Sequence, residues 1–373
     1  MRLRMIALLV GVFIGWLCML SGLKINGVTP AAFFPTSTLA ITPSLTASRT
    51  HKPSPTAAPT KTFTPTPTPS ATRSTPNIPT LTAPQPFSTV IAITVSGASK
   101  NSPIVIYAAG DIAECLGAPP DQTTGAMITS NMLLETSGPI FTLGDNSNDE
   151  GTQENYDQCY NPTWGRLLDR TYPVMGNHDR DLDNKGGAYF AYFAGKTGYW
   201  GHYSLDIGSW HIVILNSDCG IGRQNCRNKS HQEQWLRADL AATQQKCIMA
   251  LWHQPLFTSG NEPESAVTKS FWLDLYNAKA DIILNGHNHL YERFDPLDPD
   301  GLADPNGIRE FVVGTGGAVL QPPISPPVYG EIIRNATTFG YLKLTLFTDS
   351  YQWQFVAQPG RYFTDSGTAN CHR

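Results

Sequence analysis

Residues 282–293 read IILNGHNHLYER, a short apolar run followed by an asparagine, a glycine and two histidines. The run has the length and the β-rich composition of a buried strand, and the Asn-Gly pair after it marks a turn. His287 and His289 are therefore expected just beyond the carboxyl end of a strand. Imidazole side chains at such a position are typical of metal sites and of acid–base catalysis.

The same arrangement, an apolar run that ends in a polar side chain, occurs at four other places. Residues 104–113 read IVIYAAGDIA, residues 140–146 IFTLGDN, residues 172–179 YPVMGNHD and residues 248–253 IMALWH. Ligands of α/β sheets gather beyond the carboxyl ends of the strands. We therefore expect Asp111, Asp145, Asn177 and His253 to share one rim with the two histidines. A single Gly-Asp turn would carry little weight, because such turns are common.

Apolar runs alternate with amphipathic stretches along the chain, which predicts an α/β fold. The strand-rich last third indicates a mixed sheet or a pair of sheets. Ser230, with Glu233 three residues later, has the pattern of a capping box at a helix start. The expected helices are Thr124–Thr136, Ser230–Thr243 and Val267–Asn277. The expected strands are Ile104–Ala109, Ile140–Leu143, Tyr172–Met175, Trp210–Asn216, Ile248–Trp252, Ile282–Leu284, Arg309–Val313, Tyr341–Phe347 and Gln352–Val356.

The donor set indicates two metal ions. Two carboxylates, one carboxamide and three imidazoles are more ligands than one tetrahedral zinc ion takes. A pair of ions about 3.5–4 Å apart, bridged by one carboxylate, uses them all. Mixed nitrogen and oxygen donors suit divalent Fe, Mn or Zn better than Ca or Mg. The expected chemistry is hydrolysis of a phosphate ester by a hydroxide that bridges the two ions.

The ordered motifs resemble those of the calcineurin-like metallophosphoesterases. The segment GHNHLYER at residues 286–293 resembles in particular the purple acid phosphatase branch of that superfamily. The resemblance covers about residues 103–356. It implies a four-layer α/β/β/α sandwich of two mixed sheets.

The resemblance also implies a role for each polar residue. The metal ligands would be Asp111 and His289 at the first ion, Asn177, His253 and His287 at the second, and Asp145 between them. His178 would contact the phosphoryl group and protonate the leaving oxygen. Asp179 would orient His178 by a hydrogen bond.

One departure from the family pattern concerns the first ion. Purple acid phosphatases have a ferric-binding tyrosine three residues after the bridging aspartate, and here that residue is Asn148. The histidine that many other members have two residues after the first aspartate is replaced by Ala113. The carbonyl oxygen of Asn148, or water, would take the vacant position. Without a phenolate the sequence predicts divalent ions and a colourless protein.

The charge is divided unevenly along the chain. Residues 1–110 contain eight Lys and Arg and no acid, whereas residues 111–373 contain 18 basic and 30 acidic residues, a net charge of 18 − 30 = −12. An acidic body argues against nucleic-acid binding, which needs clustered Lys and Arg. It suits a site that gathers cations, with a small phosphorylated molecule as substrate.

The amino-terminal part has the features of an export segment and a spacer. In residues 1–24, Arg2 and Arg4 precede the 19-residue uncharged run Met5–Leu23. This run is longer than the core of most cleaved signal peptides and close to a membrane span, so a signal peptide and an uncleaved anchor both stay open. Residues 25–100 are rich in Pro, Thr and Ser and are expected to be a disordered linker. The phosphoesterase domain is expected over residues 101–360, and a tail over residues 361–373.

The cysteines of the body agree with export. An even number of cysteines behind an export signal indicates disulfides in a secreted or membrane-anchored, extracytoplasmic protein. The sequence alone does not choose the pairing. Cys219–Cys226 would close a small loop. The other four cysteines then allow three pairings, of which we expect Cys115–Cys159 with, tying down the tail, Cys247–Cys371.

Two functions follow from these observations. The first is an exported or surface-anchored dinuclear-metal phosphoesterase that cleaves phosphate monoesters, and diesters as an extension of the same chemistry. The alternative is a surface binding protein on a degenerate phosphoesterase scaffold, motivated by the departures at Asn148 and Ala113. The natural substrate, the metal identity and the oligomeric state stay open.

Overall fold

The computed structural model describes residues 90–92, 102–115, 117–181, 185–198, 200–219, 226–262, 265–324 and 326–373, all of which belong to the compact unit Leu81–Arg373. The expected export segment, residues 1–24, lies outside the described residues, as does most of the expected linker. None of the described helices is both long and apolar enough to cross a membrane.

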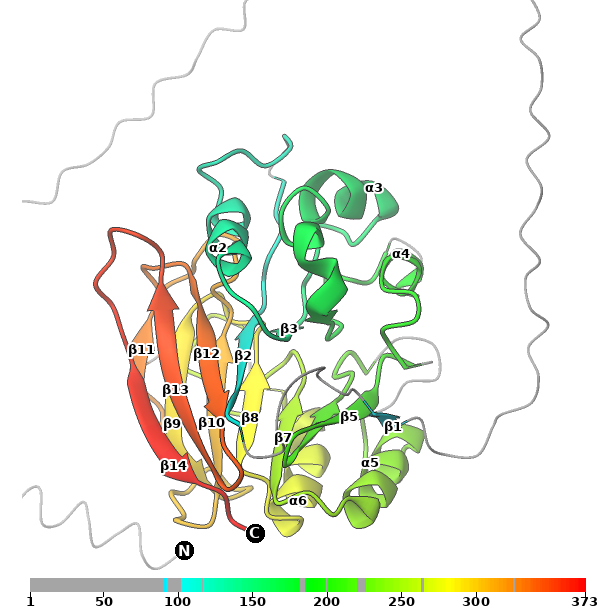
Figure 1. The fold of residues 1–373 in the computed structure, drawn as a ribbon, viewed down its shortest axis with the longest axis vertical. Helices are drawn as coiled ribbons and strands as arrows, with labels where there is room; N and C mark the ends of the chain where they lie inside the picture. The colour runs from blue at the N-terminus through cyan, green and yellow to red at the C-terminus, as the bar shows by residue number, and fades with distance from the viewer. Residues whose placement is uncertain are drawn as a thin grey trace, which may run out of the picture. The chain divides into compact units, whose positions relative to one another are not determined.

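Two mixed sheets form the body (Figure 1). The larger sheet has the order β1 (Val90–Ala92), β5 (Tyr203–Ile207), β6 (Trp210–Ile214), β7 (Cys247–Leu251), β8 (Ile282–Asn285), β10 (Ile308–Val313), β9 (Tyr291–Leu297) and β11 (Glu331–Asn335). The smaller sheet has the order β14 (Ser366–Asn370), β13 (Ser350–Ala357), β12 (Gly340–Leu346), β2 (Ile104–Ala109), β3 (Ile140–Thr142) and β4 (Thr171–Tyr172). Strands β2, β3 and β4 run parallel, as do β6, β7 and β8, so each sheet presents a row of carboxyl ends.

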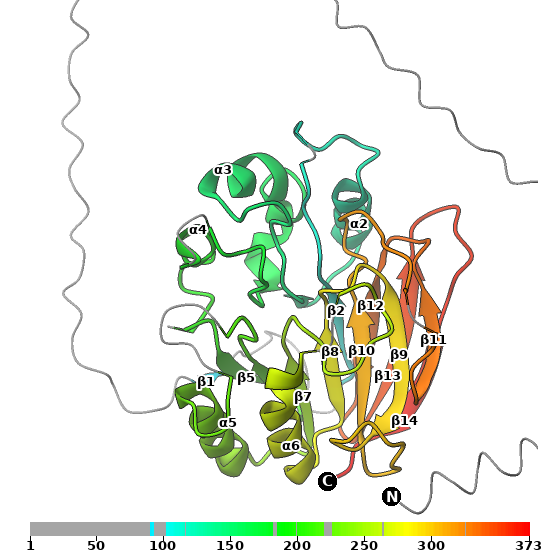
Figure 2. The same cartoon turned by 180° about the vertical axis from the view of Figure 1, so that it is seen from behind.

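The helices lie at two places. Helices α5 (His231–Ala242) and α6 (Lys269–Asn277) cover the larger sheet, as Figures 1 and 2 both show. Helices α2 (Gly125–Leu134), α3 (Gln153–Asn155) and α4 (Gly187–Tyr192) lie toward the end of the sheets at which β2 ends, together with the π-helical turn Tyr156–Tyr160 and the 3-10 helix Trp164–Arg170. A second 3-10 turn, Ala266–Thr268, leads into α6.

The core consists of two apolar layers. In β6, Ile212 and Ile214 point into the layer between the sheets, whereas Val213 packs with Trp235 and Leu236 of α5. A strand that is buried on both faces needs this continuous apolar sequence. Strand β13 instead alternates buried aromatics with exposed glutamines, because its outer face meets solvent. The expected pairing of two mixed sheets with helices is confirmed.

Several expected elements differ in extent. The strand expected at Tyr172–Met175 is reduced to β4, because Pro173 cannot donate to a ladder and the Val174 N–H donates instead to Thr142 Oγ1 at 3.1 Å. The linker expected to be disordered contributes β1, whose Val-Ile-Ala backbone pairs with β5 at the edge of the larger sheet. The expected tail supplies β14, which pairs with β13.

Helix α5 begins where its capping pattern predicted. The Ser230 hydroxyl accepts the Glu233 N–H at 3.1 Å. The Glu233 carboxylate, however, accepts the N–H of Lys229, at 3.0 Å, so only half of the box is formed as expected.

All six cysteines of the body are paired. The disulfides are Cys115–Cys159, Cys219–Cys226 and Cys247–Cys371. This is the expected pairing, one of three that were possible once the Cys219–Cys226 loop was assumed. Cys247–Cys371 ties the carboxyl end of the chain to the first residue of β7.

Candidate metal centre

The polar residues expected at one rim come equally from the two sheets. Asp111, Asp145 and Asn177 follow β2, β3 and β4 of the smaller sheet. His253 follows β7, and His287 and His289 follow β8, in the larger sheet. The site therefore lies where the carboxyl ends of two sets of parallel strands meet.

Each aspartate has one oxygen held by the backbone and the other directed at a histidine. Asp111 Oδ2 accepts the His287 N–H at 2.9 Å, while Oδ1 lies 3.4 Å from His289 Nε2. Asp145 Oδ1 accepts the His178 N–H at 2.8 Å, while Oδ2 lies 3.2 Å from His253 Nε2. Both aspartates are almost wholly buried.

His253 and His289, the two histidines that face the aspartates, each have their tautomer fixed by a carbonyl oxygen. His253 Nδ1 donates to Leu143 O, and His289 Nδ1 donates to Val319 O, each at 2.8 Å. A carbonyl oxygen only accepts, so the hydrogen of the neutral ring is on Nδ1 and the lone pair is on Nε2. Each lone pair then faces a carboxylate oxygen. Two buried acceptors at such distances require a proton or a metal ion between them.

The electrostatics of the site favour a cation. Burial opposes the charged form of His253, but the Asp145 carboxylate outweighs it and raises the pKa to about 10. Burial likewise opposes protonation of His289, and Asp111 raises the pKa to about 9. For His287, burial and then repulsion by His253 lower the pKa to about 4. The field that holds a proton on two of these rings is the field that would hold a divalent cation.

The remaining two donors join the same group. Asn177 Oδ1 lies 3.1 Å from His253 Nε2, and the rings of His253 and His287 are 5.0 Å apart between centroids. One donor atom from each of Asp111, Asp145 and His253 lies within 4.8 Å of the others. The structure thus brings all six expected donors together.

The backbone is strained at three of these residues. Asp111, Asp145 and His287 have φ values of 57°, 49° and 72°, in the left-handed region that costs a side chain of this kind about 1–3 kcal/mol. A neighbouring glycine makes the approach possible, since a Cβ at Gly176 would lie 2.1 Å from Asp145 Oδ1. Strain concentrated on three donors indicates a site whose geometry is selected for binding.

Two buried oxygens test whether the residues fit a metal. Asp111 Oδ1 and Asn148 Oδ1 accept no hydrogen bond from any residue within the described ranges. The Asn148 N–H donates to Ala113 O at 2.7 Å, which keeps Asn148 beside the loop that carries Asp111. Buried oxygens without a donor are costly, and a cation would satisfy them. The donor set therefore fits metal ions.

The hydrogen bond expected between Asp179 and the His178 ring is not formed. Asp179 is buried and its carboxylate accepts from Gly176 N, Ser147 N, Asn146 Nδ2 and Tyr156 Oη, at 2.6–3.1 Å. The His178 ring donates instead from Nδ1 to the backbone oxygen of Asp149, at 2.7 Å. Asp179 braces the loops beneath the site, and the exposed His178 is oriented by another residue.

Glu292 and Arg293, the last two residues of the motif GHNHLYER, bind different partners. Neighbouring residues of strand β9 point to opposite faces, so the two side chains cannot meet. Glu292 accepts from Thr258 and Ser259, at 2.7–2.8 Å, in the loop after His253. Arg293 forms a two-bond pair with Asp365, at 2.7 and 3.1 Å.

Two further charged residues near the site carry no motif in the sequence. Arg180 Nε lies 2.8 Å from Asp218 Oδ2, and Arg180 also donates to Asn177 O at 3.3 Å. Burial raises the pKa of Asp218 to about 6, against the opposing charge of Arg180. Asp218 lies in the loop after β6. No glycine precedes it at the end of that strand, so the pattern that identified the other site residues did not identify Asp218.

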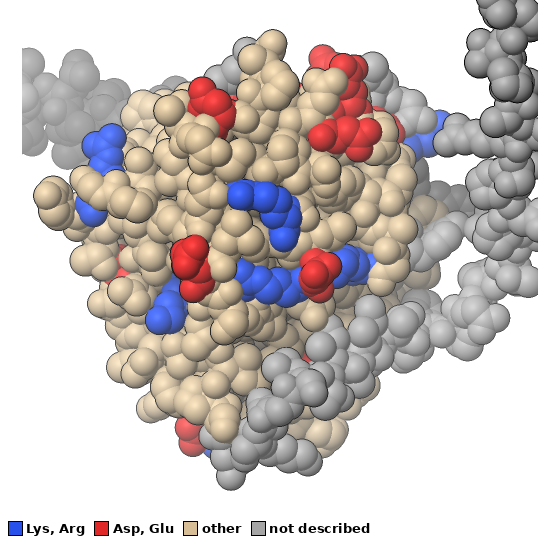
Figure 3. Space-filling model, turned by 45° about the horizontal axis from the view of Figure 1, so that its top comes forward, with Lys and Arg blue, Asp and Glu red and all other residues tan. Residues whose placement is uncertain are grey.

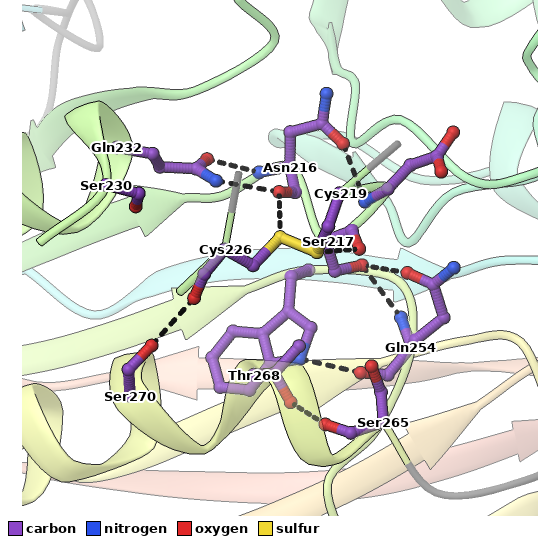
Figure 4. Close-up of a disulfide and its surroundings, with 12 residues drawn as sticks. Asn216, Ser217, Cys219, Cys226, Ser230, Gln232, Gln254, Ser265, Thr268 and Ser270 are labelled. Atoms are coloured by element: carbon purple, nitrogen blue, oxygen red, sulfur yellow. Dashed lines mark hydrogen bonds between the residues drawn. A yellow bond between two sulfur atoms is a disulfide. The ribbon is translucent and has the colours of Figure 1, made fainter. Parts of the chain in front are cut away.

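That loop is fixed from three sides, as Figure 4 shows. Gln232 of α5 bonds both backbone groups of Asn216, each at 2.8 Å. The disulfide Cys219–Cys226 closes it. The Gln254 N–H donates to Ser217 Oγ at 3.0 Å, which joins the loop to the residue after His253.

Comparison with known proteins agrees with this geometry. The sequence profile of calcineurin-like phosphoesterases matches residues 104–291. Purple acid phosphatase 22 of Arabidopsis thaliana is 32% identical over 126 residues, which are 31% of this chain and 27% of that protein. Purple acid phosphatase 21 of the same plant is 27% identical over 58% of this chain and 50% of its own length. The matches thus span half or less of these relatives.

Solved structures share the fold. Purple acid phosphatase PPD1 from yellow lupin superposes with a TM-score of 0.62 and 20% identity, over 72% of this chain and 54% of that one. GAP50, the anchor in the inner membrane complex of Plasmodium, superposes with a TM-score of 0.57 and 14% identity, over 73% of this chain and 90% of that one.

Proposed function

We propose, from the premise that this chain belongs to the calcineurin-like phosphoesterase family, that it is a dinuclear-metal hydrolase of phosphate monoesters, with diesters as further substrates. The observation that carries the proposal is the pairing of buried acceptors, His253 with Asp145 and His289 with Asp111, at 3.2 and 3.4 Å. Such pairs are unfavourable without a cation between them. Hydrolysis is the chemistry that two cations at such a rim serve best.

The division of ligands is the one that the family resemblance implies, and the contacts of Asp145 with His253 and of Asp111 with His289 support it. Asp111 and His289 would hold the first ion; Asn177, His253 and His287 would hold the second; Asp145 would touch both. Bound there, the two cations would polarise the phosphoryl oxygens and activate the attacking water. Of the catalytic pair expected from the sequence, we retain His178 alone, because it is exposed and its backbone is fixed to Asp145. It would bind the phosphoryl group and give a proton to the leaving oxygen.

The ions would be divalent. Asn148 offers a neutral oxygen at the position of a ferric-binding phenolate, and its Oδ1 has no described hydrogen-bond donor. We expect Mn, Zn or Fe(II) rather than Fe(III), and a colourless protein. Asn148→Tyr, loaded with Fe(III), should gain a visible absorption band. A band of that kind in the unmodified protein would contradict the assignment.

The site of action would be outside the cytoplasm. Three disulfides within one body are typical of exported proteins, since cytosolic thiols are kept reduced. The apolar run Met5–Leu23 would direct export, as a signal peptide or as an anchor. On the face seen in Figure 3, Lys and Arg are few and lie beside acidic residues, which suits a small phosphorylated substrate better than a nucleic acid.

The test is turnover of p-nitrophenyl phosphate and its bis-ester by the purified chain. The protein is stripped of metal and then reloaded with Mn, Zn, Fe(II) or Co. We expect turnover that depends on the metal and falls at least about a hundredfold in Asp145→Asn. His231→Asn, a change on the exposed face of α5, is the matched control and should keep full activity.

A binding protein on a degenerate scaffold is the second candidate. It is favoured by the loss of both usual extra ligands at the first ion, at Asn148 and Ala113, and by the shared fold of the Plasmodium anchor protein. A folded chain without turnover under any metal, unchanged by Asp145→Asn, would support this candidate and exclude the hydrolase.

A further inference from the structure

The orientation of His178 depends on a loop that a disulfide closes. We propose that Asp149 is the positioning residue of His178, that the Cys115–Cys159 disulfide holds Asp149 in place, and that reduction of this disulfide lowers turnover. This inference rests on the proposed function, because it concerns the residue that would meet the phosphoryl group.

The loops after β2 and β3 are paired along their backbones. Ile112 N donates to Asp145 O at 2.9 Å, and Ala113 N donates to Asn146 O at 3.1 Å. The N–H of Asn148 returns to Ala113 O at 2.7 Å. The two loops that carry the aspartates of the site thus continue the parallel pairing of their strands, up to Asp149.

Asp149 forms the last contact of this paired segment. Its Oδ2 accepts the Cys115 N–H at 3.0 Å and lies 3.9 Å from Cys159 Sγ. Cys115 and Cys159 are bonded to each other, with 5.5 Å between their Cα atoms. The disulfide therefore closes the segment directly beside the Asp149 carboxylate.

The following turn packs tightly against the backbone of His178. Gly151 has a φ of 58°, and a Cβ there would meet His178 O at 2.3 Å. A displacement of the loop would therefore reach His178 without passing through the metal ligands.

The His178 ring has one orienting bond among the described residues. Its backbone N–H is fixed on Asp145 Oδ1, but the ring itself is exposed and donates from Nδ1 to Asp149 O at 2.7 Å. Because that oxygen only accepts, the bond keeps the hydrogen on Nδ1 and leaves Nε2 for a ligand. Loss of the bond would free both the rotation and the tautomer of the ring.

Reduction of the Cys115–Cys159 bond alone would release the loop and leave the other two disulfides intact. A dithiol such as dithiothreitol gives two electrons and two protons to the Cys115–Cys159 bond, which becomes two thiols while the reagent becomes a disulfide. The bond Cys247–Cys371 offers a matched control, because Cys247 begins β7 and His253 follows its opposite end.

The first experiment compares two disulfide knockouts in the metal-loaded full chain. Cys115→Ser/Cys159→Ser should lose about tenfold or more in kcat for phenyl phosphate, a substrate with a poor leaving group, with KM nearly unchanged. Cys247→Ser/Cys371→Ser should keep kcat and lower only the melting temperature. Equal losses of kcat in the two knockouts would overturn the proposal.

The second experiment asks whether the effect passes through His178. In a His178→Ala background, removal of the Cys115–Cys159 bond should cause no further loss, because the positioned ring is already absent. Asp149→Ala, which keeps the disulfide but removes the bond to Cys115, should give an intermediate loss. Additive losses would show that the disulfide acts elsewhere and would overturn the proposal.

A third measurement needs no turnover. In the metal-free protein, imidazole proton–nitrogen correlation spectra should show His178 with its hydrogen on Nδ1, and a mixture of tautomers after Cys115→Ser/Cys159→Ser. An unchanged tautomer would overturn the positioning role. If the unmodified protein lacks turnover under every metal, the proposed function fails, and the spectra alone decide this inference.

Discussion

Metal binding should stabilise the folded chain by an amount that depends on which ligand is present. An ion that binds only the folded state adds RT ln(1 + [ion]/Kd), about 2.7 kcal/mol at a hundredfold excess over Kd. Two ions would add about 5.4 kcal/mol. At about 2–4 °C per kcal/mol for a domain of this size, the melting temperature should rise by roughly 10–20 °C.

Substitution of different ligands should remove different parts of this stabilisation. Asp145 contacts His253 directly and shares a 4.8 Å group of donor atoms with Asp111, so it borders both expected ions. Asp145→Asn should abolish nearly the whole rise. His289 Nε2 lies 3.4 Å from Asp111, at the first expected ion, so His289→Asn should remove about one ion, or about 2.7 kcal/mol.

The assay is differential scanning calorimetry of stripped protein with and without Mn or Zn, together with titration calorimetry for the number of ions. We expect two ions in the wild type, one in His289→Asn and none bound tightly in Asp145→Asn. His231→Asn should behave as the wild type. A full rise in Asp145→Asn, or equal losses in the two site variants, would refute the assignment of Asp145 as the shared ligand.

Three further changes test the surroundings of the site. In Gly176→Ala the new methyl would lie 2.1 Å from a carboxylate oxygen of the site, so titration calorimetry should show weakened metal binding, and two tightly bound ions would contradict this. Asp365→Ala leaves the mostly buried Arg293 without its carboxylate and should lower the free energy of urea unfolding by about 3–5 kcal/mol. Asp300→Ala, which breaks an exposed pair with Lys269, should cost little. Equal costs would contradict the claim that burial makes the Arg293–Asp365 pair the stronger one. Burial opposes the charged form of His211, but two flanking carboxylates outweigh it and raise the pKa. The charge of His211 therefore stabilises the fold below about pH 6.5, and this contribution is lost as the pH rises through the raised pKa. The difference in the free energy of urea unfolding between the wild type and His211→Gln should shrink from pH 6 to pH 9, and a constant difference would exclude the linkage.

The fold was predictable to the extent that it depends on local pattern. The runs that became β2, β6, β7 and β8 are mostly apolar, which is what a strand buried on both faces requires. Strands β1, β5, β9, β11 and β14 were not predicted. Charged residues interrupt the sequences of β5, β9 and β11, and β14 has no apolar run, so no local pattern marks these segments as strands.

The sequence by itself determined the six expected donors, their order along the chain and the turns that carry them. Each donor follows an apolar run, and short-range chemistry specifies such a turn. Only the tertiary structure decided how these residues are held. That the carbonyl of Asp149 orients His178 in place of Asp179, that Arg293 pairs with Asp365, and that Arg180 meets Asp218 depends on loops that approach one another across 29 to 72 residues of sequence. No local pattern encodes such an approach, because it is set by the packing of two sheets against each other.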